Sequence, residues 1–243
     1  MIAAALALTI AGVCVRLGMW QLDRLHGRRE INASIRAGLG RPPQPLDTLL
    51  GEGPAASLGY RLVTVTGTYD DDDDVILYGR SLEARNGNHV LTALRPSGGG
   101  PLVIVDRGWV PVEMDTPPLE GAAPPSGEVT VTGALFPPDG SGGDALGART
   151  VSRVDLTQIA ATLGTRVLPM YVLLSAQDPP QPGPLPIPAP LPELTEGPHL
   201  SYAFQWFAFA TIAIVGLVVL VGRDLRDQDD HDADGSTGPT GQG

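Results

Sequence analysis

The chain has 243 residues, a formal net charge of −11 at pH 7 and a pI near 4.6. This acidic balance excludes a non-specific nucleic-acid-binding protein, which needs a basic surface. Hydrophobic residues make up 42% of the chain, enough for a folded core, and the single cysteine, Cys14, excludes a disulfide framework or a thiol-based metal site.

The first apolar segment, residues 2–19, contains one charged side chain, Arg16, and is followed by Trp20. A segment of this length suits either a signal-peptide core or a transmembrane helix. No basic region precedes it and no small-residue cleavage site follows it, so we expect an uncleaved helix. Arg16 can extend its long side chain to the interface, and Trp20 suits the membrane boundary. We assign transmembrane helix 1 to residues 1–20 and a connector, rich in Pro and Gly in its second half, to residues 21–57.

The central region, residues 58–176, is expected to form a β-rich domain. Apolar runs separated by turn residues predict strands at Tyr60–Tyr69, Val75–Arg80, His89–Leu94, Leu102–Val105, Glu128–Phe136 and Leu168–Ser175. A short helix should begin after Asp155, a good N-cap residue, and end at Leu163. Many short strands with one helix indicate a mainly β domain, barrel-like or sandwich-like.

The first predicted strand shows the clearest alternation. Val63 and Val65 alternate with Thr64 and Thr66, so one pair should face the core and the other should be more exposed. The acidic run Asp70–Asp74 lacks the spacing and the glycine of an EF-hand calcium loop. We therefore expect it to be a solvated hairpin turn.

Two further motifs in the domain invite a functional interpretation. Ser97–Gly100 is not a phosphate-binding loop, because no Lys-Ser/Thr pair follows it. Asp106–Trp109 could form a binding edge, since Arg and Trp both suit interfaces, or Arg107 could pair with Asp106 or another neighbour. The residues leave both interpretations open. No constellation of serine, histidine and carboxylate suggests a hydrolase, so we expect no catalytic residues and no enzyme.

A second apolar segment follows a Pro-rich linker, residues 177–198, and is assigned to transmembrane helix 2, residues 199–222. It carries no charge from Tyr202 to Val221, a length sufficient to cross a bilayer core of about 30 Å. Its first turns are more polar than an anchor needs: they contain His199, Ser201, Tyr202, Gln205 and Trp206. In a helix His199, Tyr202 or Ala203, and Trp206 share one face. We expect this helix to recognise something at the outer edge of the membrane.

His199 has two interpretations. Neutral imidazole is a common axial ligand of haem iron. A helix end in an apolar setting also suits a porphyrin with a long hydrocarbon tail, against which Tyr202 and Trp206 could pack. Alternatively, His199 is a polar interfacial residue that hydrogen-bonds to headgroups or to a neighbouring helix. The residues alone leave both open and slightly favour the second.

Charge around the second apolar segment predicts the orientation. Arg223 and Arg226 follow it and acidic residues precede it, which places the C-terminus in the cytoplasm. The first segment gives the contrary bias, but long loops translocate largely regardless of charge. We expect residues 20–198 outside the cell, both termini inside, and a disordered acidic tail at residues 223–243. All 16 basic residues are arginine, a bias typical of GC-rich bacteria, so the membrane should be a bacterial cell membrane.

Five short motifs are spread along nearly the whole chain. They are Gly18–Arg24, Tyr60–Val63 with Gly67–Tyr69, Gly87–Thr92, Val105–Pro111, and His199–Phe207. Together they resemble the Surfeit-locus family of cytochrome c oxidase biogenesis proteins. The resemblance implies two transmembrane helices flanking an extracytoplasmic β-rich domain, and a role in maturing the haem–copper oxidase. In bacterial relatives it implies binding of haem a for delivery, with the histidine at the second helix start, here His199, as the proposed ligand.

We therefore expect an integral-membrane assembly factor for an aa3-type oxidase that binds haem a, with His199 on the iron and Tyr202 and Trp206 beside it. Its expected partners are the oxidase subunits, above all the haem-bearing catalytic subunit, together with the lipid bilayer. The machinery of haem a synthesis and a respiratory supercomplex are further candidates. Two alternatives remain: a haem-independent module that stabilises an oxidase subunit or supercomplex, and an envelope β-domain with an unrelated ligand.

Overall fold

The computed structural model describes residues 2–140, 142, 145–147 and 149–235. By its contacts the chain divides into two compact units. The larger unit, residues 33–193, contains the β-rich domain, and the smaller unit combines residues 1–32 with residues 194–243.

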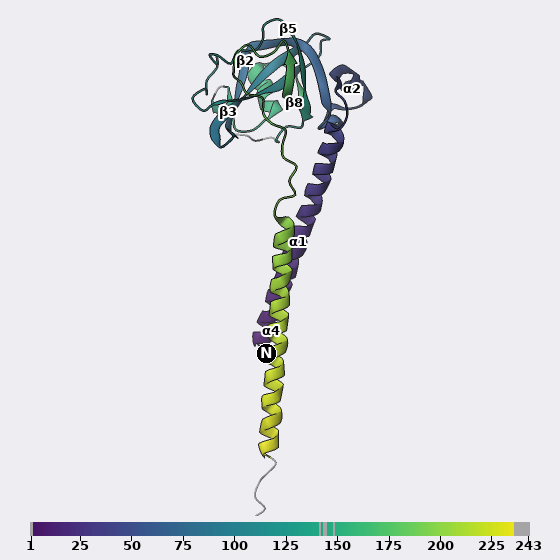
Figure 1. The fold of residues 1–243 in the computed structure, drawn as a ribbon, viewed down its shortest axis with the longest axis vertical. Helices are drawn as coiled ribbons and strands as arrows, with labels where there is room; N and C mark the ends of the chain where they lie inside the picture. Colours follow the sequence, from purple (N-terminus) through teal and green to yellow (C-terminus); the bar gives the residue numbers. More distant parts are fainter. Residues whose placement is uncertain (1, 141, 143–144, 148, 236–243) are drawn as a thin grey trace, which may run out of the picture. The chain divides into compact units, whose positions relative to one another are not determined.

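Five long strands of the larger unit close into a barrel (Figure 1). They are β2 (Leu62–Leu82), β3 (Arg85–Pro96), β4 (Leu102–Pro111), β5 (Glu128–Phe136) and β8 (Val167–Asp178). The order around the barrel is β2-β3-β4-β8-β5 and back to β2, and among these pairs only β4 with β8 is parallel. Closure therefore pairs both edges of each long strand. The sheet is extended beside β2 by the short strands β1 (Gln44–Pro45), β6 (Ala145–Gly147) and β7 (Thr150–Val151).

Four of the predicted strands are confirmed. Glu128–Phe136 is β5, and β8 contains the predicted closing strand, Leu168–Ser175. The predicted strands His89–Leu94 and Leu102–Val105 lie in β3 and β4, which are antiparallel neighbours. Of the two architectures expected from the strand pattern, the structure has the barrel.

The acidic run Asp70–Asp74 is not a hairpin turn, so that prediction was wrong. Strand β2 continues through it, and Val75–Arg80 belongs to the same strand rather than to a returning one. The pairing with β3 shifts register between these two segments, which marks a bulge and lets the long strand bend around the barrel. The turn to β3 comes instead at Glu83 and Ala84, whose positive φ angles of 50° and 62° suit a two-residue hairpin loop.

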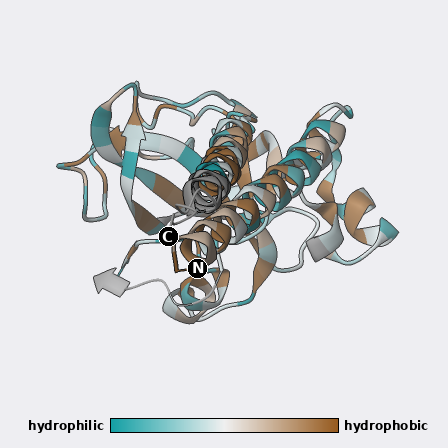
Figure 2. Cartoon of the chain, turned by 90° about the horizontal axis from the view of Figure 1, so that it is seen from below, coloured by the Kyte–Doolittle hydropathy of each residue, from teal (hydrophilic) through white to brown (hydrophobic). Residues whose placement is uncertain are grey.

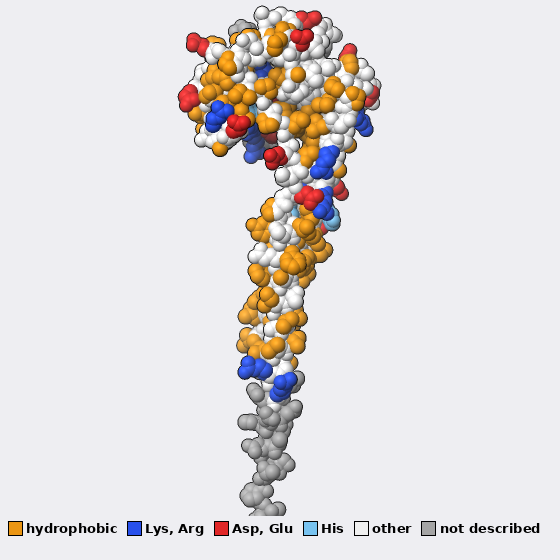
Figure 3. Space-filling model, viewed as in Figure 1, with side chains coloured by type: hydrophobic (Ala, Val, Ile, Leu, Met, Phe, Trp, Pro, Cys, Tyr) orange, Lys and Arg blue, Asp and Glu red, His pale blue; other side chains and the backbone are white. Residues whose placement is uncertain are grey.

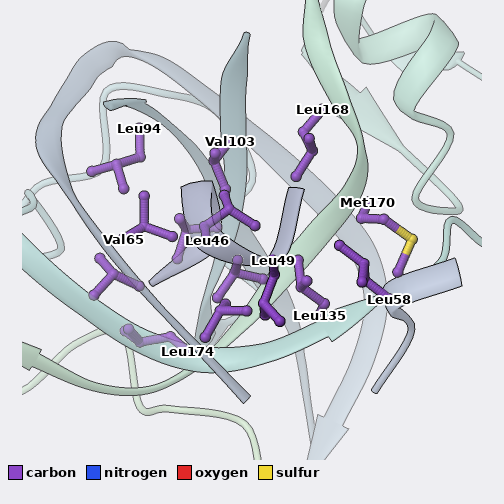
Figure 4. Packing of buried hydrophobic residues seen from close by; sticks show 14 of the residues in the cluster. Leu46, Leu49, Leu58, Val65, Leu94, Val103, Leu135, Leu168, Met170 and Leu174 are labelled. Carbon is purple, nitrogen blue, oxygen red and sulfur yellow. The ribbon is translucent and has the colours of Figure 1, made fainter. Parts of the chain in front are cut away.

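The alternation predicted for the first strand is confirmed, with the valines inside. Val63 and Val65 are 0% and 5% exposed, whereas Thr64 is half-buried and Thr66 is exposed. The two valines belong to the largest buried cluster of the barrel, part of which Figure 4 shows. This strand therefore contributes one face to the core and leaves the other to the outer surface.

One end of the barrel is filled by a segment that the sequence indicated only as a connector. Helix α1 (Ile2–Leu39) occupies its first part, and α2 (Leu46–Glu52) and a 3-10 helix, η1 (Ala55–Leu58), follow. Leu46 and Leu49 of α2 are buried among the barrel residues (Figure 4). The Pro- and Gly-rich composition of this stretch concealed a helix whose two leucines complete the core.

The predicted short helix is confirmed as α3 (Leu156–Leu163). The Asp155 carboxylate accepts hydrogen bonds from the backbone N–H groups of Thr157 and Gln158, at 3.0 and 3.1 Å. This satisfies donors that a helix start otherwise leaves unpaired. Gly164 ends the helix with a φ of 64°, in the left-handed region that glycine adopts most easily.

In the smaller unit, α1 and α4 (His199–Gly235) each contain a stretch long and apolar enough to cross a membrane. Most apolar side chains of these stretches are exposed, unlike those of a core helix in a soluble protein. Figure 2 shows the hydrophobic residues along the helices, and Figure 3 shows apolar side chains on their surface. The helices approach closely at Gly18, where an added Cβ would stand 2.8 Å from ring carbons of Phe207. Small residues at such contacts are typical of membrane helix pairs.

Both helices extend beyond their predicted ends. Helix α1 continues past residue 20 to Leu39, and α4 continues past residue 222 to Gly235. The expectation of disorder from residue 223 is therefore wrong as far as Gly235, and the rest of the tail, 236–243, lies outside the described residues. No proline interrupts residues 223–235, and a helix already formed gains one hydrogen bond for each residue that it adds.

Candidate functional site

His199 begins α4, and its ring is held by a residue of α1. Its Nδ1 lies 2.9 Å from Oε1 of Gln21. Because an amide oxygen only accepts hydrogen bonds, this contact requires Nδ1 to carry the proton. In the neutral ring, Nε2 then has a free lone pair, which is the state that a metal ligand needs.

Gly197 lies next to the Nε2 edge of this ring. A Cβ added at Gly197 would lie 3.5 Å from both Nε2 and Cδ2 of His199. An imidazole-bound metal ion lies about 2 Å from the nitrogen, so a larger side chain at this position would occupy space next to it. Gly197 also has a φ of 68°, which favours glycine. The local backbone thus turns the chain into α4 with a residue that has no side chain beside Nε2.

A cavity of about 440 Å³ lies beside His199. Its lining residues are Asp23, Arg24, Gly27, Arg28, Ile31 and His199. All but the histidine come from α1, just beyond the apolar stretch of that helix. The volume is in the range of sites that bind small molecules, and most of the lining residues are polar or charged.

Two contacts fix the entry of the chain into α4. Arg29 makes two hydrogen bonds of 2.9 Å to the carboxylate of Glu196. Asn32, which is buried, donates to the carbonyl oxygen of Thr195 at 3.1 Å. A bidentate contact of this kind, with two parallel hydrogen bonds, fixes the orientation of the two side chains as well as their distance. These contacts hold the residues just before His199 against α1.

The two aromatic residues predicted to accompany His199 lie further along α4. Tyr202 is 48% exposed, and Trp206 is half-buried with its ring edge-to-face against Phe209, the centroids being 5.9 Å apart. Ala203, rather than Tyr202, is the buried residue of this turn, at 1% exposure. Neither aromatic side chain belongs to the lining of the His199 cavity. The structure therefore brings Gln21 and the α1 arginines to His199, and not Tyr202 or Trp206.

Sequence reasoning missed Gln21, because it is 178 positions away from His199. The same holds for Arg29 and Asn32, whose partners are 167 and 163 positions away. Local patterns such as helix periodicity report only neighbours a few positions apart. The one available indication was the motif Gly18–Arg24, which contains Gln21 and stands at the exit of the first apolar segment.

Of the two interpretations of Asp106–Trp109, the structure favours the ion pair. Arg107 is buried, and its guanidinium nitrogen Nη1 lies 4.0 Å from Oδ1 of Asp74 and 3.3 Å from the hydroxyl of Thr92. Burial lowers the pKa of Arg107, and the charge of Asp74 opposes this effect. Asp106 instead pairs with Nδ1 of His89, at 2.8 Å. These charges are buried in the domain and do not form a surface edge.

Trp109 is also part of the barrel and not of a binding surface. It is 4% exposed, and the guanidinium carbon of Arg85 lies 4.9 Å from the centroid of its ring. Its backbone N–H donates to the carbonyl of Ile187 at 2.7 Å. The motif therefore ties the linker to the barrel.

The comparisons with known proteins agree with the motifs. The model of the SURF1 family matches residues 8–211. An uncharacterized SURF1-like protein of Mycobacterium tuberculosis is 34% identical over 212 residues, which cover 83% of this chain and 75% of the relative. A SURF1-like protein of Monosiga brevicollis is 26% identical over 88% of this chain and 85% of the relative. A SURF1-like protein of Rickettsia bellii is also 26% identical, over 84% of this chain and 84% of the relative. The chain is therefore a bacterial member of the SURF1 family, whose members are known in general as cytochrome oxidase assembly factors.

Proposed function

We propose that this protein binds haem a through His199 and delivers it to the catalytic subunit of an aa3-type cytochrome c oxidase. The observation that carries the proposal is the state of the His199 ring. Its Nδ1 is hydrogen-bonded to Gln21, Gly197 lies beside its Nε2 edge, and a cavity adjoins the residue. Family membership supports the oxidase as the destination, and this geometry supports haem as the cargo.

The residues of the site fit such a cargo. Neutral imidazole is a common axial ligand of haem iron. A hydrogen bond from Nδ1–H to a fixed acceptor orients the ring and raises the basicity of the other nitrogen; here that acceptor is Gln21. Below the site both helices are apolar, which suits the hydrocarbon tail of haem a. In this proposal the chain's own residues hold and orient the cargo and carry out no bond chemistry on it.

The test is the absorption spectrum of the full chain. The protein would be purified in detergent from membranes that make haem a, or mixed with added haem a after purification. We expect the bands of protein-bound haem a, and extraction of the pigment should identify it as haem a rather than haem b. A protein that shows no such bands under either condition would overturn the proposal and leave a haem-independent role in oxidase assembly.

The same proposal places residues 20–198 outside the cell and both termini in the cytoplasm. A phosphatase reporter that is active only outside can be inserted at Gly140, in an exposed loop after β5. We expect this fusion to be active, and a fusion at the C-terminus to be inactive. An inactive Gly140 fusion, together with activity of a cytoplasmic reporter at the same position, would show the reverse orientation.

A further inference from the structure

Two arginines share the cavity with His199. Arg24 and Arg28 are four residues apart on α1, and both line the cavity. Side chains at this spacing are neighbours on one face of a helix. Asp23 is the one acidic residue of the lining, so the cavity keeps a net positive charge beside the imidazole.

We infer that Arg24 and Arg28 bind the two propionate carboxylates of the porphyrin, so that the site selects a dianionic macrocycle. This inference rests on the proposed function, because His199 would bind the iron of the same ligand. The propionates are adjacent on one edge of a haem, and two guanidinium groups one helical turn apart can each meet one of them. Arginine presents a planar fork of N–H donors that matches a carboxylate.

The two side chains are available for this role. The structure records no ion pair for Arg24 or Arg28 among the residues that it describes, whereas the next arginine, Arg29, is engaged by Glu196. The guanidinium carbon of Arg24 lies 5.9 Å from the centroid of Trp20. Stacking of this kind steadies an arginine and leaves its in-plane N–H groups free to donate.

Anionic lipid headgroups are the competing ligand at this depth, because arginines at a membrane boundary attract them. To bind a lipid phosphate, however, the site would need only the positive charges of Arg24 and Arg28. The same cavity is also lined by an imidazole whose Nδ1 is hydrogen-bonded to Gln21 and whose Nε2 edge lies beside Gly197. The combination of one metal-ligand nitrogen and two cations favours a metalloporphyrin over a phospholipid.

The experiment compares two probes on the full chain in detergent. In iron protoporphyrin IX both propionates are free carboxylates. In its dimethyl ester both are esterified and carry no charge. We expect the parent to bind the free acid about tenfold more tightly than the ester, because charge-assisted hydrogen bonds to two carboxylates are lost with the ester. In Arg24→Gln/Arg28→Gln this ratio of affinities should fall to near one. The affinity for the free acid should decrease, and the affinity for the ester should stay the same.

Two control variants sharpen the comparison. Arg36→Gln/Arg41→Gln removes the same charge from exposed positions outside the cavity lining and should leave the ratio unchanged. Arg24→Lys/Arg28→Lys keeps the charge without the fork, and it should retain part of the preference for the free acid.

The outcomes separate this inference from the proposed function. If the parent binds neither porphyrin nor haem a, the proposed function fails. If the parent binds both porphyrins equally, while His199→Ala loses both, haem binding stands and the role of the arginines is wrong. The inference is equally wrong if the glutamine variant loses co-purifying phosphatidylglycerol but keeps the parent's preference for the free acid, since the arginines would then hold lipid.

Discussion

His199→Ala is expected to remove most of the bound haem a while the protein stays folded and inserted in the membrane. The substitution removes the imidazole nitrogen that is proposed to bind the iron and leaves the apolar stretch of α4 unchanged. The hydrogen bond to Gln21 is lost as well, but the contacts of Arg29 and Asn32 just before the helix remain. Haem content of the purified protein, measured per mole of chain, checks this result.

Matched variants show whether the effect belongs to the iron ligand. His26→Ala removes an exposed histidine of α1 that lies outside the cavity lining, and it should bind haem a like the parent. Trp206→Ala should weaken haem retention less than His199→Ala, since it removes packing from α4 and leaves the imidazole in place. In cells that carry only the His199→Ala protein, the oxidase should contain little haem a and its activity should fall.

The results that would contradict the ligand role are distinct. Normal haem binding together with normal oxidase maturation in the His199→Ala protein would end the ligand hypothesis. Normal haem binding with failed maturation would instead make His199 a contact residue for a partner protein. In that case Gln21 would orient the ring for a hydrogen bond and not for iron.

The candidate site shows which contacts local sequence patterns can indicate and which they cannot. His199 stands out because a polar cluster opens an otherwise apolar segment, and that pattern is local. Its real neighbours come from α1, and only folding brings residues 21–31 beside residue 199. Helix periodicity placed Tyr202 and Trp206 on the same face, but a shared face does not decide whether a side chain reaches the cavity.

The fold shows the same division between local and distant information. Strands such as β5, and the helix capped by Asp155, follow from alternation and capping within a few residues. The long strand β2 could not be predicted in this way, because five successive aspartates indicate a turn. Only the bulge and the partner strand show that β2 continues through them. Asp74 lies buried in that strand near Arg107, 33 positions later in the chain. Such a charge pair overrides local propensity, which is a weak guide for strands.

Val65→Asp is expected to destabilise the barrel by about 3 kcal/mol or more, because it places a carboxylate without a partner in the core. Val65 is 5% exposed and belongs to the main buried cluster, opposite Val131 of β5. Thr64→Asp, one position earlier on the half-buried face, should cost no more than about 1 kcal/mol.

Protease resistance and thermal unfolding of the detergent-extracted protein would measure both substitutions. Val65→Asn, which matches Asp in size but carries no charge, should fall between them, since an uncharged polar group costs less to bury than a charge. Equal effects at positions 64 and 65 would mean that the strand does not present Val65 to the core. The inward register of β2 would then be wrong, and with it the pairing of Val65 with Val131 that closes the barrel against β5.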